Sequence, residues 1–345
     1  MNHLPRSCCR GGLRAMVTGA AWLLLVAAAA PTQTVDPDVD AFSRPLRQDL
    51  LVATISTPPA GMPADVASAL REIGPRVDAA RTAPLYIPLH AGRAHPGVQV
   101  QRELAYGPDP RHRADVFTPR GGTGGKPVLV FAYGGGFRGA YRSSQDSPFY
   151  DNIGYWAAEN DLVGITIQYR LAPEFTYPAG AEDIARVVAW VRERAAGWGG
   201  DPEKIFLWGH SSGAAHVADY LVRTPDAPVR AAILMSGIYD PGAAQSMWSH
   251  YYGDDVSKDA ERSSLARLIR LPLPIMAVWA ELDAPNFLPD TQRLIRGRRE
   301  AGRPVVEVFL PNHSHLSEAY AVGTDDVSLT APLLQFIREQ GSSRR

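Results

Sequence analysis

The stretch KIFLWGHSSG, residues 204–213, decides the fold of this chain. Its first part is apolar, as in a strand that is buried on both faces of a sheet. Gly209-His210-Ser211-Ser212-Gly213 follows at once and leads into a helical pattern. A nucleophile on a sharp strand-to-helix turn needs small neighbours, and glycine provides them on both sides. We therefore expect the Ser211 hydroxyl at the carboxyl end of a strand, beside the free N–H groups of a helix.

Similar apolar runs recur along the chain and alternate with helical patterns. The clearest helical pattern is 181–196, where apolar residues recur at i, i+3, i+4 and i+7. Strands that alternate with helices predict an α/β fold, with a mostly parallel eight-stranded sheet and helices on both faces. The first two runs are joined by a short link and predict an antiparallel edge. The predicted strands are 98–106, 114–119, 127–133, 162–169, 204–209, 230–237, 274–281 and 305–311.

A serine nucleophile needs a base to take its proton, and the base needs an acid to orient it. Asp283 comes just after the strand 274–281, and His315 comes just after the strand 305–311. The chain order serine, acid, histidine is the order expected for this architecture. We interpret Asp290 as a helix-capping acid and His313 as a side chain that supports the loop. The predicted catalytic residues are therefore Ser211, Asp283 and His315.

A glycine-rich loop, Tyr133-Gly134-Gly135-Gly136-Phe137, follows the strand 127–133. Attack on an ester carbonyl develops a negative oxygen, which fixed backbone N–H groups stabilise when the chain can approach closely. We predict an oxyanion hole made by the backbone of Gly135, Gly136 and Ser212. Side chains near the predicted mouth are candidates for substrate binding: Phe137, Tyr141, Phe149, Tyr239 and His210.

These motifs together resemble the α/β-hydrolase fold, in its hormone-sensitive-lipase-like and carboxylesterase branch. The resemblance runs from about residue 98 to residue 340 and rests on the segments YGGGF (133–137), QYRLAPEFTYPAGAEDI (168–184), WGGDPEKIFLWGHSSG (198–213), SGIYD (236–240), ELD (281–283) and HSH (313–315). SGIYD and HSH also resemble feruloyl-esterase-like and kynurenine-formamidase-like relatives. One position departs from the pattern, because Tyr133 stands where the family usually has histidine before the glycines.

The resemblance implies hydrolysis of carboxylic esters through an acyl-enzyme on Ser211, with no cofactor. Hydrolysis of amides or formamides by the same triad is the alternative, and a binding module that has no catalytic activity is a third reading. The sequence contains no cluster of residues typical of a metal site, and we expect EDTA to leave activity unchanged. The expected partner is a small ester substrate. We expect no nucleic acid and no stable membrane partner, and the oligomeric state stays open.

The N-terminal region predicts an export signal. Residues 1–15 contain arginines and no acid, and residues 16–30 are an apolar run that is short for a membrane span. We expect a signal peptide over 1–30 and a secreted or periplasmic protein, with an uncleaved anchor as the alternative. Cys8 and Cys9 are the only cysteines, so a chain cleaved after the apolar run has no disulfide.

Two further segments have an expected place in the domain organisation. Residues 31–97 form a lead-in with short helices, one of them over 63–73, before a hydrolase domain at 98–345. Residues 240–272 are longer than a usual connection and form either a small lid or a surface excursion.

The 345 residues are 45% hydrophobic and 21% charged, with a formal net charge of −1. This composition is that of a globular protein, and it shows no basic stripe for nucleic acid.

Overall fold

The computed structural model describes residues 58–121, 123–139 and 147–342, and all of them belong to one compact unit, Arg47–Arg345. The predicted signal peptide, the first part of the lead-in and Tyr141 lie outside the described residues. Within the described ranges, no helix has the length and apolar character needed to cross a membrane.

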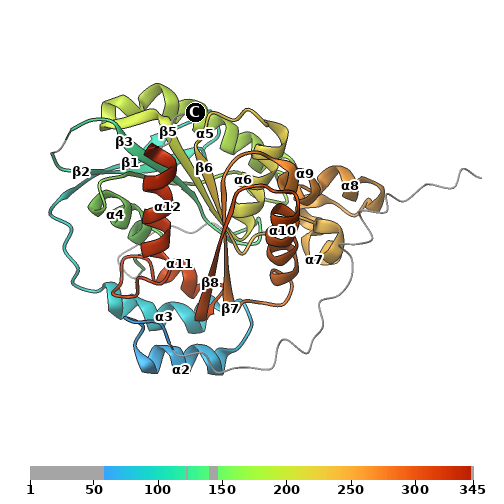
Figure 1. The fold of residues 1–345 in the computed structure, drawn as a ribbon, viewed down its shortest axis with the longest axis horizontal. Helices are drawn as coiled ribbons and strands as arrows, with labels where there is room; N and C mark the ends of the chain where they lie inside the picture. Colours follow the sequence, from blue (N-terminus) through green and yellow to red (C-terminus); the bar gives the residue numbers. More distant parts are fainter. Residues whose placement is uncertain (1–57, 122, 140–146, 343–345) are drawn as a thin grey trace, which may run out of the picture. The chain divides into compact units, whose positions relative to one another are not determined.

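The predicted eight-stranded, mostly parallel sheet is confirmed (Figure 1). The strand order is β1-β2-β4-β3-β5-β6-β7-β8. β1 pairs antiparallel with β2, and β2 pairs antiparallel with β4, whereas all the later neighbours are parallel. The strands are β1 (Val98–Ala105), β2 (Arg113–Pro119), β3 (Lys126–Ala132), β4 (Val163–Ile167), β5 (Gly200–His210), β6 (Ala231–Met235), β7 (Ile275–Leu282) and β8 (Val305–Ser314).

Helices cover both faces of the sheet, as the alternating pattern predicts. The longer helices are α2 (Ala64–Ile73), α3 (Ala79–His90), α4 (Asp151–Glu159), α5 (Ala179–Arg194), α6 (Ser212–Arg223), α7 (Gln245–Tyr252), α10 (Leu288–Glu300) and α12 (Thr330–Ser342). β3 shows why two layers form, because its side chains alternate between two cores. Leu129 and Phe131 pack with residues of α2, α4 and α12, whereas Val128 and Val130 pack with residues of α5 and α6.

The lead-in packs on the main core through α2 and α3. Val66, Leu70 and Ile73 of α2 and Tyr86 of α3 are buried in the same hydrophobic cluster as Phe131. The predicted helix over 63–73 matches α2, whereas α3 was not predicted. Pro84 and Pro88 lie inside α3, and proline normally argues against a helix interior. Tertiary packing overrides that local preference here.

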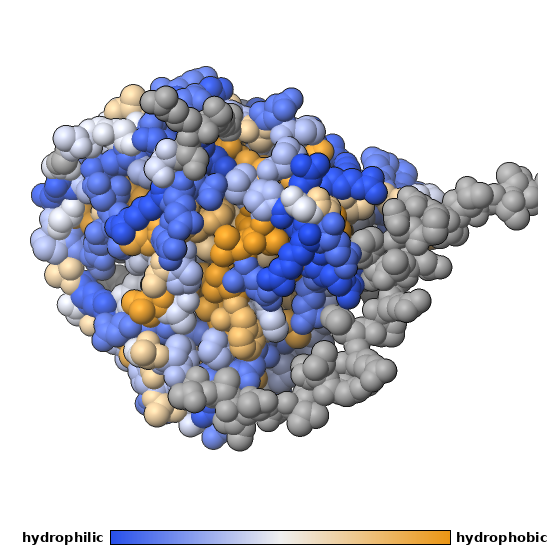
Figure 2. All heavy atoms as spheres, viewed as in Figure 1, coloured by the Kyte–Doolittle hydropathy of each residue, from blue (hydrophilic) through white to orange (hydrophobic). Residues whose placement is uncertain are grey.

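The stretch 240–272 folds into short helices between β6 and β7. They are η3 (Pro241–Ala244), α7, η4 (Val256–Lys258), α8 (Asp259–Arg262) and α9 (Leu265–Arg270). Trp248, Tyr251 and Tyr252 of α7 are buried in a small cluster with Phe137 and Phe287, near the carboxyl ends of the strands. β8 forms the far edge of the sheet and carries the exposed side chains Val306 and Phe309, and Figure 2 shows apolar surface in this part of the molecule.

Candidate active site

Ser211 lies on the turn between β5 and α6. Its φ angle is 56°, a left-handed value that is strained for a residue with a side chain. Backbone bonds hold it there: the Ser211 amide donates to the Met235 carbonyl at 2.9 Å, and the Ser211 carbonyl accepts from Ala214 at 3.0 Å. The sharp turn expected from the sequence is therefore present, and backbone hydrogen bonds keep Ser211 in its strained conformation.

The two glycines that flank this turn are required by close packing. A Cβ atom on Gly209 would collide with the backbone of Ala214, and one on Gly213 would collide with the carbonyl oxygens of Ala132 and Tyr133. Gly134 is restricted in the same way from the opposite side, because a Cβ atom there would lie 2.7 Å from the Cβ of Ser211. The glycine-rich loop and the serine turn thus approach each other as closely as backbones allow.

Asp283 and His315 form a buried pair at the carboxyl ends of β7 and β8. His315 Nδ1 lies 2.7 Å from Asp283 Oδ1, and both residues are 1% exposed. Asp283 is itself held by the hydroxyl of Ser236 and by the backbone N–H of Ala284. The His315 ring stacks on Phe287 with 4.0 Å between ring centroids. The imidazole is therefore oriented on one edge by a carboxylate and on one face by an aromatic ring.

Ser211 and His315 both line one cavity of about 530 Å³. Among the described residues, no hydrogen bond joins the Ser211 hydroxyl to the His315 ring. Catalytic hydrogen bonds are often long in ligand-free structures and tighten when substrate binds. The structure thus brings the predicted nucleophile and base to one cavity without yet joining them.

The glycine loop presents its backbone to the same cavity. Gly135 and Gly136 line it, and both have positive φ angles, at 152° and 57°. The Gly135 carbonyl accepts from Gly139 at 2.7 Å, and the Gly136 carbonyl lies 2.8 Å from His250 Nε2. In the described parts of the chain, the N–H groups of Gly135, Gly136 and Ser212 donate no hydrogen bond to a protein atom. These amides are therefore available for a negatively charged oxygen.

Tyr133, which replaces the usual histidine, supports this loop from the core. Its ring stacks against Tyr169 at 4.9 Å, with Tyr150 parallel at 6.0 Å. The Tyr169 hydroxyl donates to the Tyr133 carbonyl at 2.7 Å. Aromatic packing thus supports the backbone that leads into the glycines.

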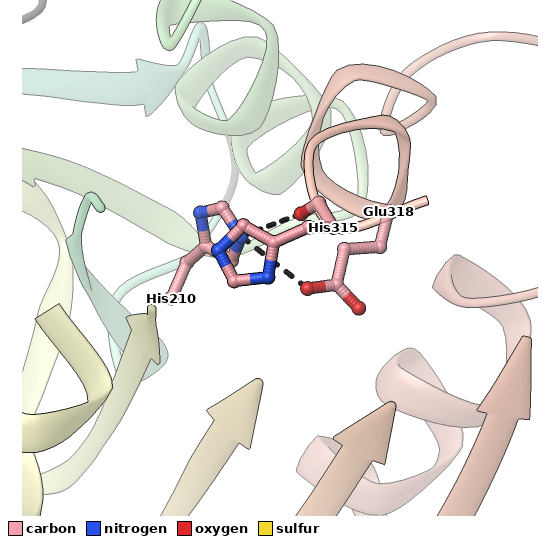
Figure 3. Close-up of side chains that lie close together, drawn as sticks. All are labelled: His210, His315 and Glu318. Atoms are coloured by element: carbon pink, nitrogen blue, oxygen red, sulfur yellow. Dashed lines mark hydrogen bonds and ion pairs between the residues drawn. The ribbon is translucent and has the colours of Figure 1, made fainter. Parts of the chain in front are cut away.

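Two further polar side chains, His210 and Glu318, lie close to His315, as Figure 3 shows. His210 Nε2 lies 2.8 Å from the His315 carbonyl and 3.3 Å from Glu318 Oε1. Both His210 and Glu318 are fully buried. Burial lowers the pKa of His210 well below its usual value, and burial and the Asp283 charge raise the pKa of Glu318 well above its own. Burial therefore favours the neutral form of both side chains.

This cluster was not anticipated from the sequence. One nitrogen from each histidine and one oxygen of Glu318 lie within 4.8 Å of one another, a spacing that could hold a metal ion. The sequence did contain one signal, because Glu318 comes three residues after His315, where a helical turn would bring the two side chains together. A lone glutamate gives no reason to expect complete burial.

The contacts of His313 and Asp290 can be compared with the roles that the sequence predicts for these two residues. His313 contacts Asp326 at 2.9 Å and Ser317 at 3.0 Å, so it supports the loop as expected. Asp290 lies in the first turn of α10, but its carboxylate accepts from the backbone N–H groups of Tyr239 and Asp240. It therefore ties α10 to the segment after β6, which corrects its interpretation as a simple helix cap.

Three of the predicted substrate-binding side chains, Phe137, Phe149 and Tyr239, do not line the cavity. Tyr239 is completely buried and Phe137 is 1% exposed, and neither lines it. Burial raises the pKa of the Tyr239 hydroxyl, as expected for a core residue. Phe137 instead stacks on Tyr251 at 4.3 Å, and Phe149 stacks on Tyr320 at 3.8 Å. Of the remaining candidates, His210 lines the cavity, and Tyr141 lies outside the described residues.

Other segments complete the wall, and one of them, α7, lies in the stretch 240–272 that was expected to form either a lid or a surface excursion. They are the loop between α2 and α3, helix α7, the loop after β7 and helix α11 (Ser317–Tyr320). Their lining residues include Arg76, Val77, Trp248, Phe287 and Tyr320. Each comes from a segment far from Ser211 in the sequence, so local motifs could not identify them.

Comparison with known proteins finds esterases among the similar sequences and structures. The BD-FAE family model matches residues 114–225, about a third of the chain. Isoprenylcysteine alpha-carbonyl methylesterase of Arabidopsis thaliana is 34% identical over 120 residues, which are 35% of this chain and 27% of the relative. Para-nitrobenzyl esterase of Bacillus subtilis is 29% identical over 160 residues, which cover 42% and 31%. The match thus spans only about a quarter to a third of these relatives.

Solved structures match over most of the described chain. A bacterial heroin esterase aligns with a TM-score of 0.61 and 23% identity, covering 82% of this chain and 99% of its own. An esterase from the bacterial hormone-sensitive lipase family aligns with a TM-score of 0.59 and 21% identity, covering 81% and 97%. The chain therefore has the α/β-hydrolase fold, and it is similar to esterases of that fold around the nucleophile turn.

Proposed function

We propose that this protein is a carboxylic ester hydrolase that acts through Ser211. The observation that carries the proposal is the buried Asp283–His315 pair, which shares one cavity with a serine on a strained turn. The similarity to methylesterases, para-nitrobenzyl esterase and structurally known esterases supports the same reaction class. The sequence matches cover only part of each relative, and the structural matches show the fold alone. The activity of this protein is therefore a proposal.

In the first half-reaction, His315 Nε2 takes the proton of the Ser211 hydroxyl while the oxygen forms a bond to the ester carbonyl carbon. The carbonyl oxygen becomes negative and accepts hydrogen bonds from the N–H groups of Gly135, Gly136 and Ser212. The bond to the alcohol oxygen then breaks, and His315 returns the proton to that oxygen. Asp283 holds the imidazole in its working tautomer and stabilises its cation.

In the second half-reaction, water takes the place of the alcohol. His315 removes a proton from the water, the hydroxide attacks the acyl carbon, and the bond to Ser211 breaks as its oxygen regains a proton. The carboxylic acid leaves and the enzyme returns to its starting state. The cavity of about 530 Å³ is the size of typical small-molecule sites, and it has largely apolar walls.

The test is turnover of p-nitrophenyl acetate by the purified protein. We expect Ser211→Ala to abolish turnover and Ser212→Ala, which keeps the backbone N–H, to retain activity that the first variant lacks. Persistent turnover in Ser211→Ala would contradict the proposal. A parallel assay with N-formylkynurenine tests the formamide alternative, since the same triad can cleave either bond.

We also propose that the protein is exported, on the strength of the arginine-containing stretch 1–15 and the apolar run 16–30. The proposal predicts that a full-length chain expressed in a bacterium appears outside the cytoplasm with its N-terminus removed. N-terminal sequencing of the exported form locates the cleavage point. A chain that stays in the cytoplasm with its N-terminus intact would contradict this assignment.

A further inference from the structure

We propose that Arg76 forms an anion-binding subsite in the cavity, and that the preferred substrates are esters that carry a carboxylate. This inference rests on the proposed ester hydrolysis and names its substrate class. Arg76 lies in the loop between α2 and α3 and lines the same cavity as Ser211. This loop is outside the segment 114–225 that matches the family model.

The loop that carries Arg76 is held firmly at both ends. Gly74 ends α2 with a φ of 75°, Pro75 restricts the next step, and the Arg76 amide donates to the Gly74 carbonyl at 2.8 Å. Asp78 then begins α3 by accepting from the Arg81 amide at 3.0 Å. Because α2 and α3 are both anchored in the main core, the position of Arg76 is built into the fold.

The guanidinium of Arg76 is free to bind a ligand. The residue is exposed, and no hydrogen bond or ion pair to its side chain is found among the described residues. The nearest acid in sequence, Asp78, uses its carboxylate to cap α3. Arginine is a strong donor to carboxylates and can bind both oxygens at once.

Apart from the catalytic His315, the rest of the described wall gives an anion no competing cationic side chain. Arg76 is the one lysine or arginine among the described residues that line the cavity, and its neighbours include Pro75, Val77 and Met247. His210 lines the cavity too, but its lowered pKa keeps it neutral near pH 7. An apolar cavity with one arginine on its wall favours a largely apolar ester with a single anionic group at a distance from the scissile bond.

Two pairs of matched esters test the proposal with the whole protein. 4-Acetoxybenzoate and 4-acetoxybenzamide place a carboxylate or its neutral amide analogue on the alcohol side. Monomethyl terephthalate and methyl 4-carbamoylbenzoate place the same groups on the acyl side. The measured quantity is the ratio of kcat/KM for the anionic ester to that for the neutral ester, so intrinsic reactivity cancels when variants are compared.

We expect Arg76→Gln to lower this ratio by about 3- to 30-fold for at least one pair, with the change mainly in KM, as for loss of a charged hydrogen bond. Arg76→Lys should recover part of the loss, and Arg76→Glu should lower the ratio further. Arg81→Gln is the matched control, because it removes a cation from the same helix pair without touching the cavity wall. Raising the salt to about 0.5 M should reduce the ratio in the wild type more than in Arg76→Gln.

An unchanged ratio in Arg76→Gln for both pairs, with both esters still hydrolysed, would overturn the subsite and leave the proposed function standing. An equal fall of the ratio in Arg81→Gln would also overturn the subsite, since the loss of any nearby positive charge would then have the same effect. If the wild type hydrolyses none of these esters and no p-nitrophenyl acetate, it is the proposed function that fails.

Discussion

The Nδ1 atom of His315 lies 2.7 Å from the Oδ1 atom of Asp283, and both residues are buried at the carboxyl ends of β7 and β8. Because Asp283 also accepts from Ser236 and Ala284, it is fixed before any substrate arrives. The pair is pre-organised, and only the approach of the Ser211 hydroxyl remains to be completed.

Asp283→Asn removes the charge of this pair and keeps its shape. We expect kcat for p-nitrophenyl acetate to fall by about three to four orders of magnitude, since the imidazole loses its working tautomer and the support of its cation. Asp325→Asn is the control, because that exposed carboxylate pairs with Arg93 on the surface. Comparable activity in the two variants would show that Asp283 does not orient the base.

Gly134→Ala tests the close approach of the glycine loop to the nucleophile. The new Cβ would lie 2.7 Å from the Cβ of Ser211 and 3.1 Å from His210 Nδ1, so the loop or the serine must shift. We expect kcat to fall by about 100-fold or more, as for loss of an oxyanion donor. Gly124→Ala is the control, because a Cβ there meets nothing within 4 Å. A fully active Gly134→Ala would mean that this loop does not face the reacting carbonyl.

The sequence identified the features that depend on local chemistry. Gly209 and Gly213 are required by the turn itself, so the motif could place Ser211. Asp283 and His315 each follow a predicted strand, and parallel strands bring their carboxyl ends to one edge. The central strands were predicted because strands that are buried on both faces leave apolar runs, such as 127–133 and 204–209.

The features that depend on tertiary packing could not be predicted. Tyr239 and Phe137 were placed at the mouth because they follow strands, but α7 and α10 cover them. Arg76 and Trp248 reach the cavity only because α2, α3 and α7 fold back over the strand ends. No periodicity near Glu318 marks its burial, since α11 packs against residues far away in the sequence, such as His210 at the end of β5.

Glu318→Gln tests whether the protein functions with a neutral side chain at this buried position. Burial and the nearby Asp283 charge raise the pKa of Glu318, so the neutral carboxyl group is favoured, and an amide is its closest uncharged replacement. We expect kcat/KM to stay within about fivefold of the wild type between pH 6 and 8. Glu318→Ala leaves a cavity and should lower Tm by several degrees. A loss of about 100-fold in Glu318→Gln would show that an ionised carboxylate is required.

We expect the stability of the folded protein to depend on pH through Asp219, a buried residue of α6 that is not part of the catalytic pair. Burial raises its pKa to about 8 in the folded protein from 3.8, so the folded state binds the proton more tightly than the unfolded state. Its contribution to stability is complete at low pH and is lost as the pH rises toward 8. Its buried neighbour on α6, His216, has a pKa lowered to about 3 and stays neutral over this range.

Asp219→Asn lacks this titration. We expect its Tm to approach that of the wild type near pH 4.5 and to exceed it increasingly up to about pH 8, with no further gain above that value. Differential scanning fluorimetry across this pH range measures the difference. A Tm difference that is constant with pH would rule out titration of a buried Asp219.

The most direct test of the central claim is covalent labelling with a fluorophosphonate, followed by peptide mass spectrometry. Ser211 is strained, faces the cavity and has His315 on the same wall, so we predict one adduct, on Ser211, with loss of ester hydrolysis in proportion to labelling. His315→Ala should label far more slowly. An adduct on a different residue, or full activity in protein labelled at Ser211, would contradict the account.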